Sequence, residues 1–331
     1  MIRALVSQRS GRRVAQWCLV VAGVGVGAVV LPEYWLTQLA LTFVYVIATL
    51  GTDLSVGRAG VLSLCQASFV GLGAYVATVG ATHGLFLAWQ FVAAVVLCAV
   101  GGALLAIPTL RLSGMRLAII TLLFGTLFTW AIDVTIPITG GAEGMAVPLL
   151  SVGPVNSASA QSIYAFCGAF AIVFTLLVWQ LSRGQWNRRL LAVRDSELAA
   201  RSVGIQVVRT KVEVVILSAM LCGVAGVLYA YVEGFVSPSS FGTFPSAYLL
   251  VAVLLGGSGT LLGAWLGAGY ITLVPDVFGL LGIPNLYALV GGLVLVAVTL
   301  LAPGGLVSVA KSTGKALGQM QRRYAAQRSD R

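Results

Sequence analysis

The stretch FLAWQFVAAVVLCAVGGALLAI (Phe86–Ile107) contains no charged residue. A bilayer core about 30 Å thick needs roughly 20 predominantly apolar residues in helical conformation, so this stretch is long enough to cross a membrane. Similar runs fill most of the 331-residue chain, of which 59% is apolar and only 9% is charged. Soluble proteins carry about 25% charged residues. The composition therefore excludes an aqueous enzyme, a disulfide-stapled secreted protein and a disordered chain, and it predicts a polytopic membrane protein.

The same length criterion, applied along the whole chain, predicts about ten transmembrane segments and an all-α fold. The segments are Val14–Leu31, Leu36–Thr52, Ala59–Ala81, Phe86–Ile107, Leu117–Ile136, Gln161–Leu181, Val212–Gly234, Ser246–Gly257, Leu261–Gly279 and Leu286–Ala302. Some of these segments are broken by glycine, and the eighth is too short to cross the membrane as a regular helix.

The twenty Lys and Arg residues fall in alternate loops and at the two ends of the chain. Because loops rich in Lys and Arg stay in the cytoplasm, this distribution predicts that both termini are cytoplasmic. The chain then divides into a basic N-terminus (1–13), a transmembrane domain (14–305) with a cytoplasmic loop (182–211), and a basic C-terminal tail (306–331). The net charge of +10 follows from this topology and from attraction to membrane lipid, and it requires no nucleic acid.

Glycine is frequent, with 40 residues, and three glycine-rich clusters also contain polar side chains. They are GRAGVLSLCQASFVGLGAY (Gly57–Tyr75), TGGAEGM (Thr139–Met145) and GGSGTLLG (Gly256–Gly263). Two interpretations stay open, namely a translocation pathway or hinge and tight packing between helices. The candidate pathway or hinge residues are Ser63, Gln66, Thr139, Gly140, Gly141, Glu143, Gly256, Gly257, Ser258 and Gly259.

None of these clusters is a nucleotide-binding loop, because a P-loop ends in Lys and Ser or Thr, and GGSGTLLG contains no lysine. The sequence shows no catalytic triad, paired carboxylates or metal-ligand cluster, so we expect no catalytic residue, no cofactor and no metal. The five cysteines lack CxxC spacing and are predicted to be small buried side chains. If ATP drives this protein, another polypeptide must hydrolyse it.

The longest charged interruption between spans is Ser182–Lys211. Within it, Arg194–Val203 is predicted to form a short amphipathic helix. Asp195 or Ser196 can cap the start of this helix, and Gly204 can end it in a left-handed conformation. A helix of about ten residues is only ~15 Å long, too short to cross a bilayer but the right size to dock in a groove of a partner.

The two faces of this predicted helix differ in character. Glu197 and Arg201 are four residues apart, so we expect them to pair on one face. Leu198, Ala199 and Val203 form a small apolar ridge on the other face. The ridge favours docking on a partner, whereas a solvated or interfacial loop helix is the alternative.

Several ordered motifs resemble one family of transport proteins. The stretch Leu191–Ile205 resembles the coupling loop of ABC-importer permeases. The surrounding motifs resemble LivM-type permeases of the branched-chain amino acid family. These motifs are Gly57–Tyr75, LRLSGMRLAIITLLFGTL (Leu110–Leu127), TGGAEGM, the run Ile216–Phe241 and LLVAVLLGGSGTLLGAWLGA (Leu249–Ala268).

The resemblance implies a type II ABC-importer fold, of the vitamin-B12-importer kind, in the bacterial inner membrane. It also implies a non-catalytic subunit for a small polar solute, such as branched-chain or other amino acids, urea or short amides. The implied partners are a LivH-like second permease subunit, two cytoplasmic ABC ATPase subunits and an extracytoplasmic solute-binding protein. The implied ATPase-coupling residues are Arg194, Asp195, Glu197, Leu198, Ala199, Ala200 and Gly204. The alternative is an ion-coupled secondary transporter that acts alone.

Overall fold

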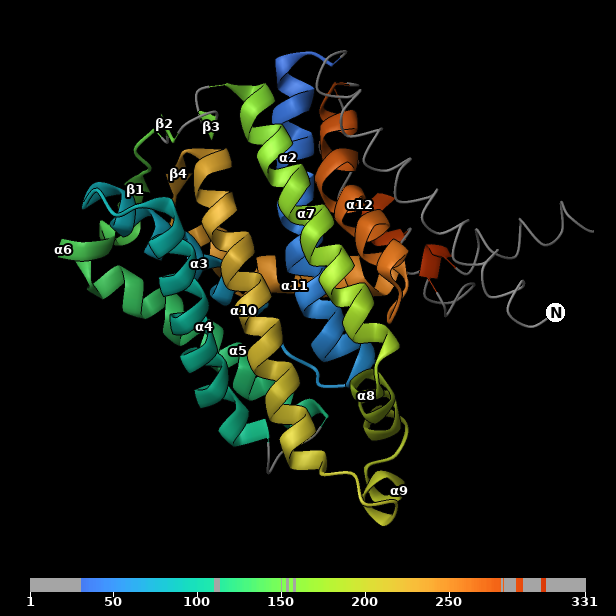
Figure 1. Cartoon of the computed structure of the whole chain (residues 1–331). Helices are drawn as coiled ribbons and strands as arrows, with labels where there is room; N and C mark the ends of the chain where they lie inside the picture. The colour runs from blue at the N-terminus through green and yellow to red at the C-terminus, as the bar shows by residue number, and fades with distance from the viewer. Residues whose placement is uncertain are drawn as a thin grey trace, which may run out of the picture.

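The computed structural model describes residues 31–109, 114–149, 151–152, 155–156, 159–280, 282, 290–293 and 305–307. Long helices form a bundle, with short strands at one end and two short helices at the other (Figure 1). The helices are α2 (Glu33–Thr52), α3 (Gln66–Thr82), α4 (Leu87–Thr109), α5 (Met115–Val134), α6 (Ile136–Thr139), α7 (Ala160–Arg183), α8 (Gln185–Asp195), α9 (Glu197–Ser202), α10 (Val207–Glu233), α11 (Thr243–Gly256) and α12 (Leu261–Leu280). A π-helix, η1 (Asp53–Arg58), continues α2, and two 3-10 helices, η2 (Gly141–Glu143) and η3 (Pro238–Phe241), lie in the loops.

Among the described residues, seven helical stretches are long and apolar enough to cross a membrane. The predicted spans Phe86–Ile107, Leu117–Ile136 and Gln161–Leu181 match α4, α5 and α7 to within a few residues. The all-helical, polytopic class is therefore confirmed. The spans Val14–Leu31 and Leu286–Ala302 lie mostly outside the described residues, so the total of about ten stays a prediction.

The prediction of one continuous span over Ala59–Ala81 is wrong at its start, because α3 begins only at Gln66. Residues 59–65 are not helical, and partners outside α3 satisfy part of their backbone. The amide of Leu64 donates to the Thr121 hydroxyl at 3.0 Å, and the amide of Val61 donates to the carbonyl of Ser55 at 2.9 Å. Protein encloses this stretch only in part, since Val61, Ser63 and Cys65 are buried whereas Gly60 and Leu62 are exposed.

The core of the bundle forms around α10, which packs along α2, α3 and α4. Glycines bring α10 and α3 into backbone contact. A Cβ atom on Gly73 would lie 2.0 Å from the carbonyl oxygen of Gly223, and one on Gly226 would lie 1.9 Å from the carbonyl oxygen of Val70. No side chain fits at either position, so these glycines set the distance between the two helices.

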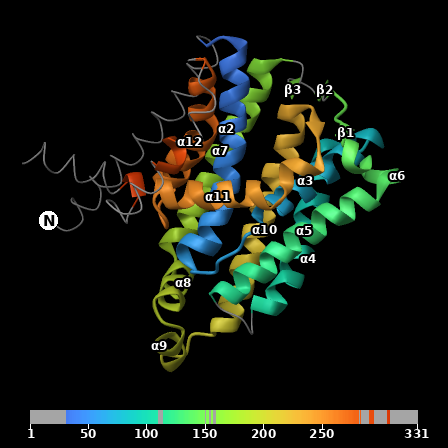
Figure 2. The same cartoon turned by 180° about the vertical axis from the view of Figure 1, so that it is seen from behind.

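The last part of the described chain departs from simple spanning. Helix α11 has only 14 residues and lies across the bundle, whereas α12 runs alongside α2 (Figure 2). A turn at residues 257–260 joins α11 to α12. The buried hydroxyls of Thr42 in α2 and Thr272 in α12 share a hydrogen bond of 2.8 Å, which ties these two helices together.

Two short antiparallel strand pairs lie at the end of the bundle opposite α9 (Figure 1). Strand β1 (Met145–Ala146) pairs with β4 (Phe235–Val236), with Met145 opposite Val236. Strand β2 (Ser151–Val152) pairs with β3 (Val155–Asn156). The first pair fastens the loop after α5 to the end of α10.

The outer helices expose many of their apolar side chains. In α4 and α5 the exposed side chains include Trp89, Val96, Leu104, Ile119, Leu127 and Trp130. A helix that is apolar on every face suits a lipid environment or burial against another membrane protein. The four described cysteines are all buried and free, which confirms the sequence prediction for these four.

Candidate functional site

The charged segment between α7 and α10, residues 185–206, forms two short helices at one end of the bundle (Figure 1). We call it the α8–α9 segment. The prediction of one helix over Arg194–Val203 is wrong, because the chain is extended at Ser196 and divides there into α8 and α9. The reason is local, since the Ser196 hydroxyl accepts a hydrogen bond from the amide of Ala199 at 3.3 Å and caps α9. Beyond α9, Gly204 adopts φ +82°, which confirms the predicted left-handed end.

The outward face of α9 exposes apolar side chains. Leu198 is 81% exposed and Val203 is 73% exposed, and Ala199 is exposed beside them. On the inward face, Ala200 packs with Val193 and Val207 in a small apolar cluster separate from the main core. The predicted ridge is therefore present, and in the described chain it faces outward.

An ion pair and a hydrogen bond tie the α8–α9 segment to α10. Glu197 does not pair with Arg201 as predicted, because its carboxylate contacts the Lys211 ammonium at 2.5 Å. Lys211 is almost buried and therefore requires a counter-charge, which Glu197 supplies. A second tie comes from the Trp186 indole, which donates to the Glu213 carboxylate at 3.1 Å.

The end of α8 contacts the first glycine cluster. The Arg194 guanidinium donates a hydrogen bond to the carbonyl oxygen of Gly57. Its side chain also lies over Gly60, where a Cβ atom would be 3.2 Å from the Arg194 Cγ. The adjacent Asp195 is exposed. Arg194 thus links the α8–α9 segment to the non-helical stretch before α3.

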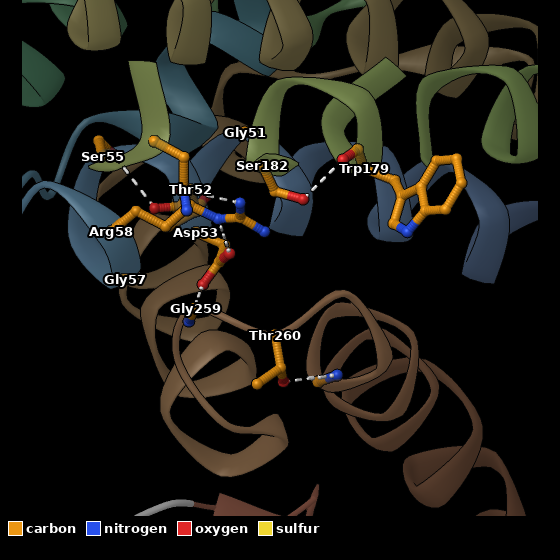
Figure 3. Close-up of polar contacts among 12 residues, drawn as sticks. Gly51, Thr52, Asp53, Ser55, Gly57, Arg58, Trp179, Ser182, Gly259 and Thr260 are labelled. Carbon is orange, nitrogen blue, oxygen red and sulfur yellow. Dashed lines mark hydrogen bonds and ion pairs between the residues drawn. The ribbon is translucent and has the colours of Figure 1, made fainter. Parts of the chain in front are cut away.

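A buried ion pair occupies the π-helix directly before Gly60. Asp53 is 2% exposed and Arg58 is 3% exposed, and the Arg58 Nε lies 3.2 Å from the Asp53 Oδ2 (Figure 3). The second oxygen of Asp53 accepts a hydrogen bond from the amide of Gly259 at 2.6 Å. The Arg58 Nη1 donates to the side-chain oxygen of Asn187 in α8 at 3.2 Å.

The first and third glycine clusters meet at this ion pair. A Cβ atom on Gly57 would lie 2.9 Å from the amide nitrogen of Gly259. Gly257 and Gly259 lie in the turn between α11 and α12, with Ser258 between them and half-buried, and Gly256 ends α11 just before it. A cavity of about 310 Å³ borders the junction and is lined by Arg58, Ser182, Asn187, Gly259, Thr260, Leu261, Leu262 and Val307.

Comparison with known proteins identifies the family of this chain. The sequence profile described as "Branched-chain amino acid transport system / permease component" matches residues 34–299. The chain belongs to this family. A relative, the high-affinity branched-chain amino acid transport system permease protein LivM of Escherichia coli K12, is 33% identical over 253 residues. That alignment covers 69% of this permease but only 60% of the relative's length.

A second relative serves a different import system. The autoinducer 2 import system permease protein LsrC of an Enterobacter species (strain 638) is 31% identical over 277 residues. This alignment covers 80% of the permease and 75% of the relative. No solved structure matches the permease. Together with the apolar helices, the family makes the permease a multi-pass membrane protein.

Gln66 occupies the polar centre of the permease. Its side chain donates to the Ser55 hydroxyl at 3.2 Å and accepts from Ser218 at 3.3 Å and from the Cys222 thiol at 3.2 Å. Gln66 therefore joins η1, α3 and α10. Ser63 is also buried, with its hydroxyl 3.2 Å from the Cys65 thiol. The contacts of Gln66 join separate helical elements, whereas that of Ser63 stays within the non-helical stretch before α3.

The second glycine cluster, Thr139–Met145, lies apart from the other two, on the far side of the bundle from α12 (Figures 1 and 2). The Thr139 hydroxyl donates to the carbonyl of Ile132 at 2.7 Å and accepts from the amide of Gly141 at 3.3 Å. Gly140, with φ +72°, and Gly141 shape this turn, and Glu143 is exposed beyond it. The first and third glycine clusters therefore contact each other, whereas the second cluster lies apart from both.

Sequence reasoning missed the partners that join the clusters. Asp53 was not among the candidate residues, and Arg58 was interpreted only as a marker of topology. Asn187 was not singled out either. The available signal was the presence of Asp53 and Arg58 at the end of an apolar run, because charges inside membrane spans are costly and mark functional positions. Within the described chain, no group of His, Cys, Asp and Glu side chains could hold a metal ion.

Proposed function

We propose that the permease is a transmembrane subunit of an ATP-driven importer in the bacterial inner membrane. The single observation that carries this proposal is the outward apolar face of α9, with Leu198 and Val203 exposed at one end of the bundle. In water such a face is unfavourable, and a groove on a partner protein would cover it. We infer that two cytoplasmic ATPase subunits supply this groove.

The distribution of charge supports the orientation that this requires. Helices α8 and α9 carry Arg188, Arg189, Arg194 and Arg201 at the same end of the bundle. Loops rich in arginine stay in the cytoplasm, so we place this end and both termini in the cytoplasm. The strand pairs and Glu143 then face outward, where an extracytoplasmic solute-binding protein would dock.

The same family membership supports the remaining parts of the proposed assembly. A second, LivH-like permease subunit would cover part of the apolar surface of the bundle, and membrane lipid would cover the rest. The solute is a small polar molecule, most simply a branched-chain or other amino acid, with urea and short amides as further candidates. A polar solute loses its hydration in the bilayer core at a large cost, and a permease lowers this barrier with an enclosed path.

In this mechanism, closure of the ATPases moves the α8–α9 segment. The segment is attached through Arg194 to Gly57, so its movement reaches the junction of the two glycine clusters. The path would then open toward one side of the membrane at a time. ATP hydrolysis itself takes place on the partner subunits.

Two experiments test the proposal. The first is co-purification from native membranes, with mass spectrometry of the bound proteins and of any retained solute. The second compares Leu198→Arg with Leu85→Arg, because Leu85 is also exposed, at 52%, but lies in the α3–α4 loop. If Leu198 is a central apolar anchor, its loss costs about 2 kcal/mol, so Leu198→Arg should weaken ATPase binding by more than about tenfold and lower ATPase recovery. Equal ATPase recovery with the two variants would contradict the proposal.

The ion-coupled secondary transporter is the competing function. It requires an acid at membrane depth that can bind and release an ion. Asp53 is a buried acid, but both of its oxygens are already bonded, to Arg58 and to the amide of Gly259. This arrangement favours the importer. Uptake by the purified chain alone in liposomes, driven by an ion gradient, would establish the competitor instead.

A further inference from the structure

The buried ion pair of Asp53 and Arg58 requires a functional explanation. Removing two charges from water costs several kcal/mol per ion, and a well-packed apolar pair of the same volume is often at least as stable. Simple stability therefore does not account for the pair. Each oxygen of Asp53 and two nitrogens of Arg58 make hydrogen bonds.

The partners of the pair belong to separate parts of the permease. Through Asn187, Arg58 contacts α8, whose last turn also contacts Gly57 through Arg194. Through the amide of Gly259, Asp53 contacts the turn between α11 and α12. The ion pair thus stands between the α8–α9 segment and this turn, and it is hydrogen-bonded to both.

The local backbone is suited to a change of position. The pair lies in a π-helix, a rare geometry that is concentrated at functional sites. A Cβ atom on Gly57 would lie 2.0 Å from the Asp53 Oδ1, so only glycine leaves the carboxylate in place. The cavity of about 310 Å³ beside Arg58 and Thr260 provides space for side chains to move.

We propose that Asp53 and Arg58 are positioning residues that transmit movement of the α8–α9 segment to the turn between α11 and α12. This inference rests on the proposed function. When the ATPases move α8, Asn187 and Arg194 move with it and Arg58 follows. Because separating buried opposite charges is strongly unfavourable, Asp53 moves with Arg58 and carries the amide of Gly259 along.

The test measures movement of the turn in the complex co-purified with its ATPases. Leu262, at the start of α12, is 66% exposed, so Leu262→Cys offers a thiol to a maleimide dye. The labelling rate is compared without nucleotide and with ATP plus vanadate, and ATP hydrolysis is measured on the same samples. In the complex whose only substitution is Leu262→Cys, called the unaltered complex below, we expect the labelling rate to change when ATP and vanadate are added.

The main variant removes both charges at once, as Asp53→Asn with Arg58→Gln. A single Asp53→Asn change would leave Arg58 buried without a counter-charge and strongly destabilise the chain. In the double variant we expect ATP hydrolysis to continue and the nucleotide-dependent change in labelling to be lost. A milder variant, Arg58→Lys, keeps the charge but lacks the planar fork that reaches both Asp53 and Asn187, so we expect a reduced change.

A matched control removes a different buried polar contact of the same helix. Thr42→Val eliminates the hydrogen bond from α2 to Thr272 in α12, away from the turn. We expect this variant to keep the full nucleotide-dependent change. If Thr42→Val lost it as well, the effect would be general loosening of the bundle, and the inference would be overturned.

The remaining outcomes separate the inference from the proposed function. If Arg58→Lys or the double variant kept the full nucleotide-dependent change in labelling rate, the role of the ion pair would be overturned. The proposed function as an importer subunit would still stand. Absence of any response in the unaltered complex would also overturn it, because the turn would not move. If no ATPase co-purified with the unaltered chain, the importer itself would be wrong.

Discussion

The interior around α10 and the α8–α9 segment are held in place in opposite ways. In the interior, glycines bring the backbones of α3 and α10 into direct contact, and the surrounding side chains are fully buried. In the α8–α9 segment only three side chains are buried: Leu190 joins the main core, and Val193 and Ala200 pack with Val207 of α10. Polar contacts provide much of the remaining attachment. We interpret the interior as a rigid frame and the α8–α9 segment as an element with few buried side chains, an arrangement that lets one part move while the other keeps its shape.

The largest loss of stability is expected from a methyl group placed between α3 and α10. Gly73→Ala would put a Cβ atom 2.0 Å from the carbonyl oxygen of Gly223, which is backbone and cannot turn aside. We expect overpacking here to destabilise the permease by about 3 kcal/mol or more. The matched control is Gly269→Ala in α12, where a Cβ atom would meet nothing within 4 Å.

Thermal unfolding in detergent, followed by size-exclusion chromatography, measures this effect. Gly73→Ala should lower the melting temperature and reduce the monodisperse fraction, whereas Gly269→Ala should stay within about 1 kcal/mol of the parent. Equal melting temperatures for the two variants would show that the interior tolerates expansion and is not the rigid frame described above.

A smaller effect is expected at the end of α9. Gly204 has φ +82° and Gly84, in the α3–α4 loop, has φ +70°, and a Cβ atom on either would meet nothing within 4 Å. Alanine therefore imposes a similar strain of about 1–2 kcal/mol at both positions. If the α8–α9 segment docks on the ATPases, Gly204→Ala should reduce ATPase recovery, whereas Gly84→Ala should leave it unchanged. The amount of ATPase per permease after co-purification measures this effect. An equal loss of ATPase with both variants would show that Gly204 has no particular role in docking.

The smallest expected effect concerns two ion pairs of α10. Glu197 and Lys211 form a partly buried pair that holds α9, whereas Arg209 and Glu213 form an exposed pair within one helix. We expect Glu197→Gln to cost about 1 kcal/mol of local stability, at the upper end for such pairs. Arg209→Gln should cost only about 0.3–0.5 kcal/mol. Hydrogen exchange of the α9 amides measures both, and faster exchange in Arg209→Gln than in Glu197→Gln would reverse our ranking.

The sequence could predict whatever depends on residues close together in the chain. The length of the apolar runs predicted α4, α5 and α7 to within a few residues. This was possible because the hydrogen bonds of a helix join residues that are close together in the chain. A cap at Asp195 or Ser196 and a left-handed end at Gly204 were predicted for the same reason, and Ser196 makes the cap by bonding to an amide three residues away. The exposure of Leu198 followed from the spacing along α9.

Only the tertiary structure decided the contacts between residues far apart in the chain. Glu197 pairs with Lys211 rather than Arg201 because α10 brings an almost buried ammonium beside it. Before Gln66, the Leu64 amide bonds to the Thr121 hydroxyl of α5 rather than to a carbonyl of its own helix. Asp53 reaches Gly259 across more than half of the chain. These pairings depend on how the helices pack against one another. Packing brings together residues that are far apart in the chain, and the spacing of residues along the chain does not specify which ones meet.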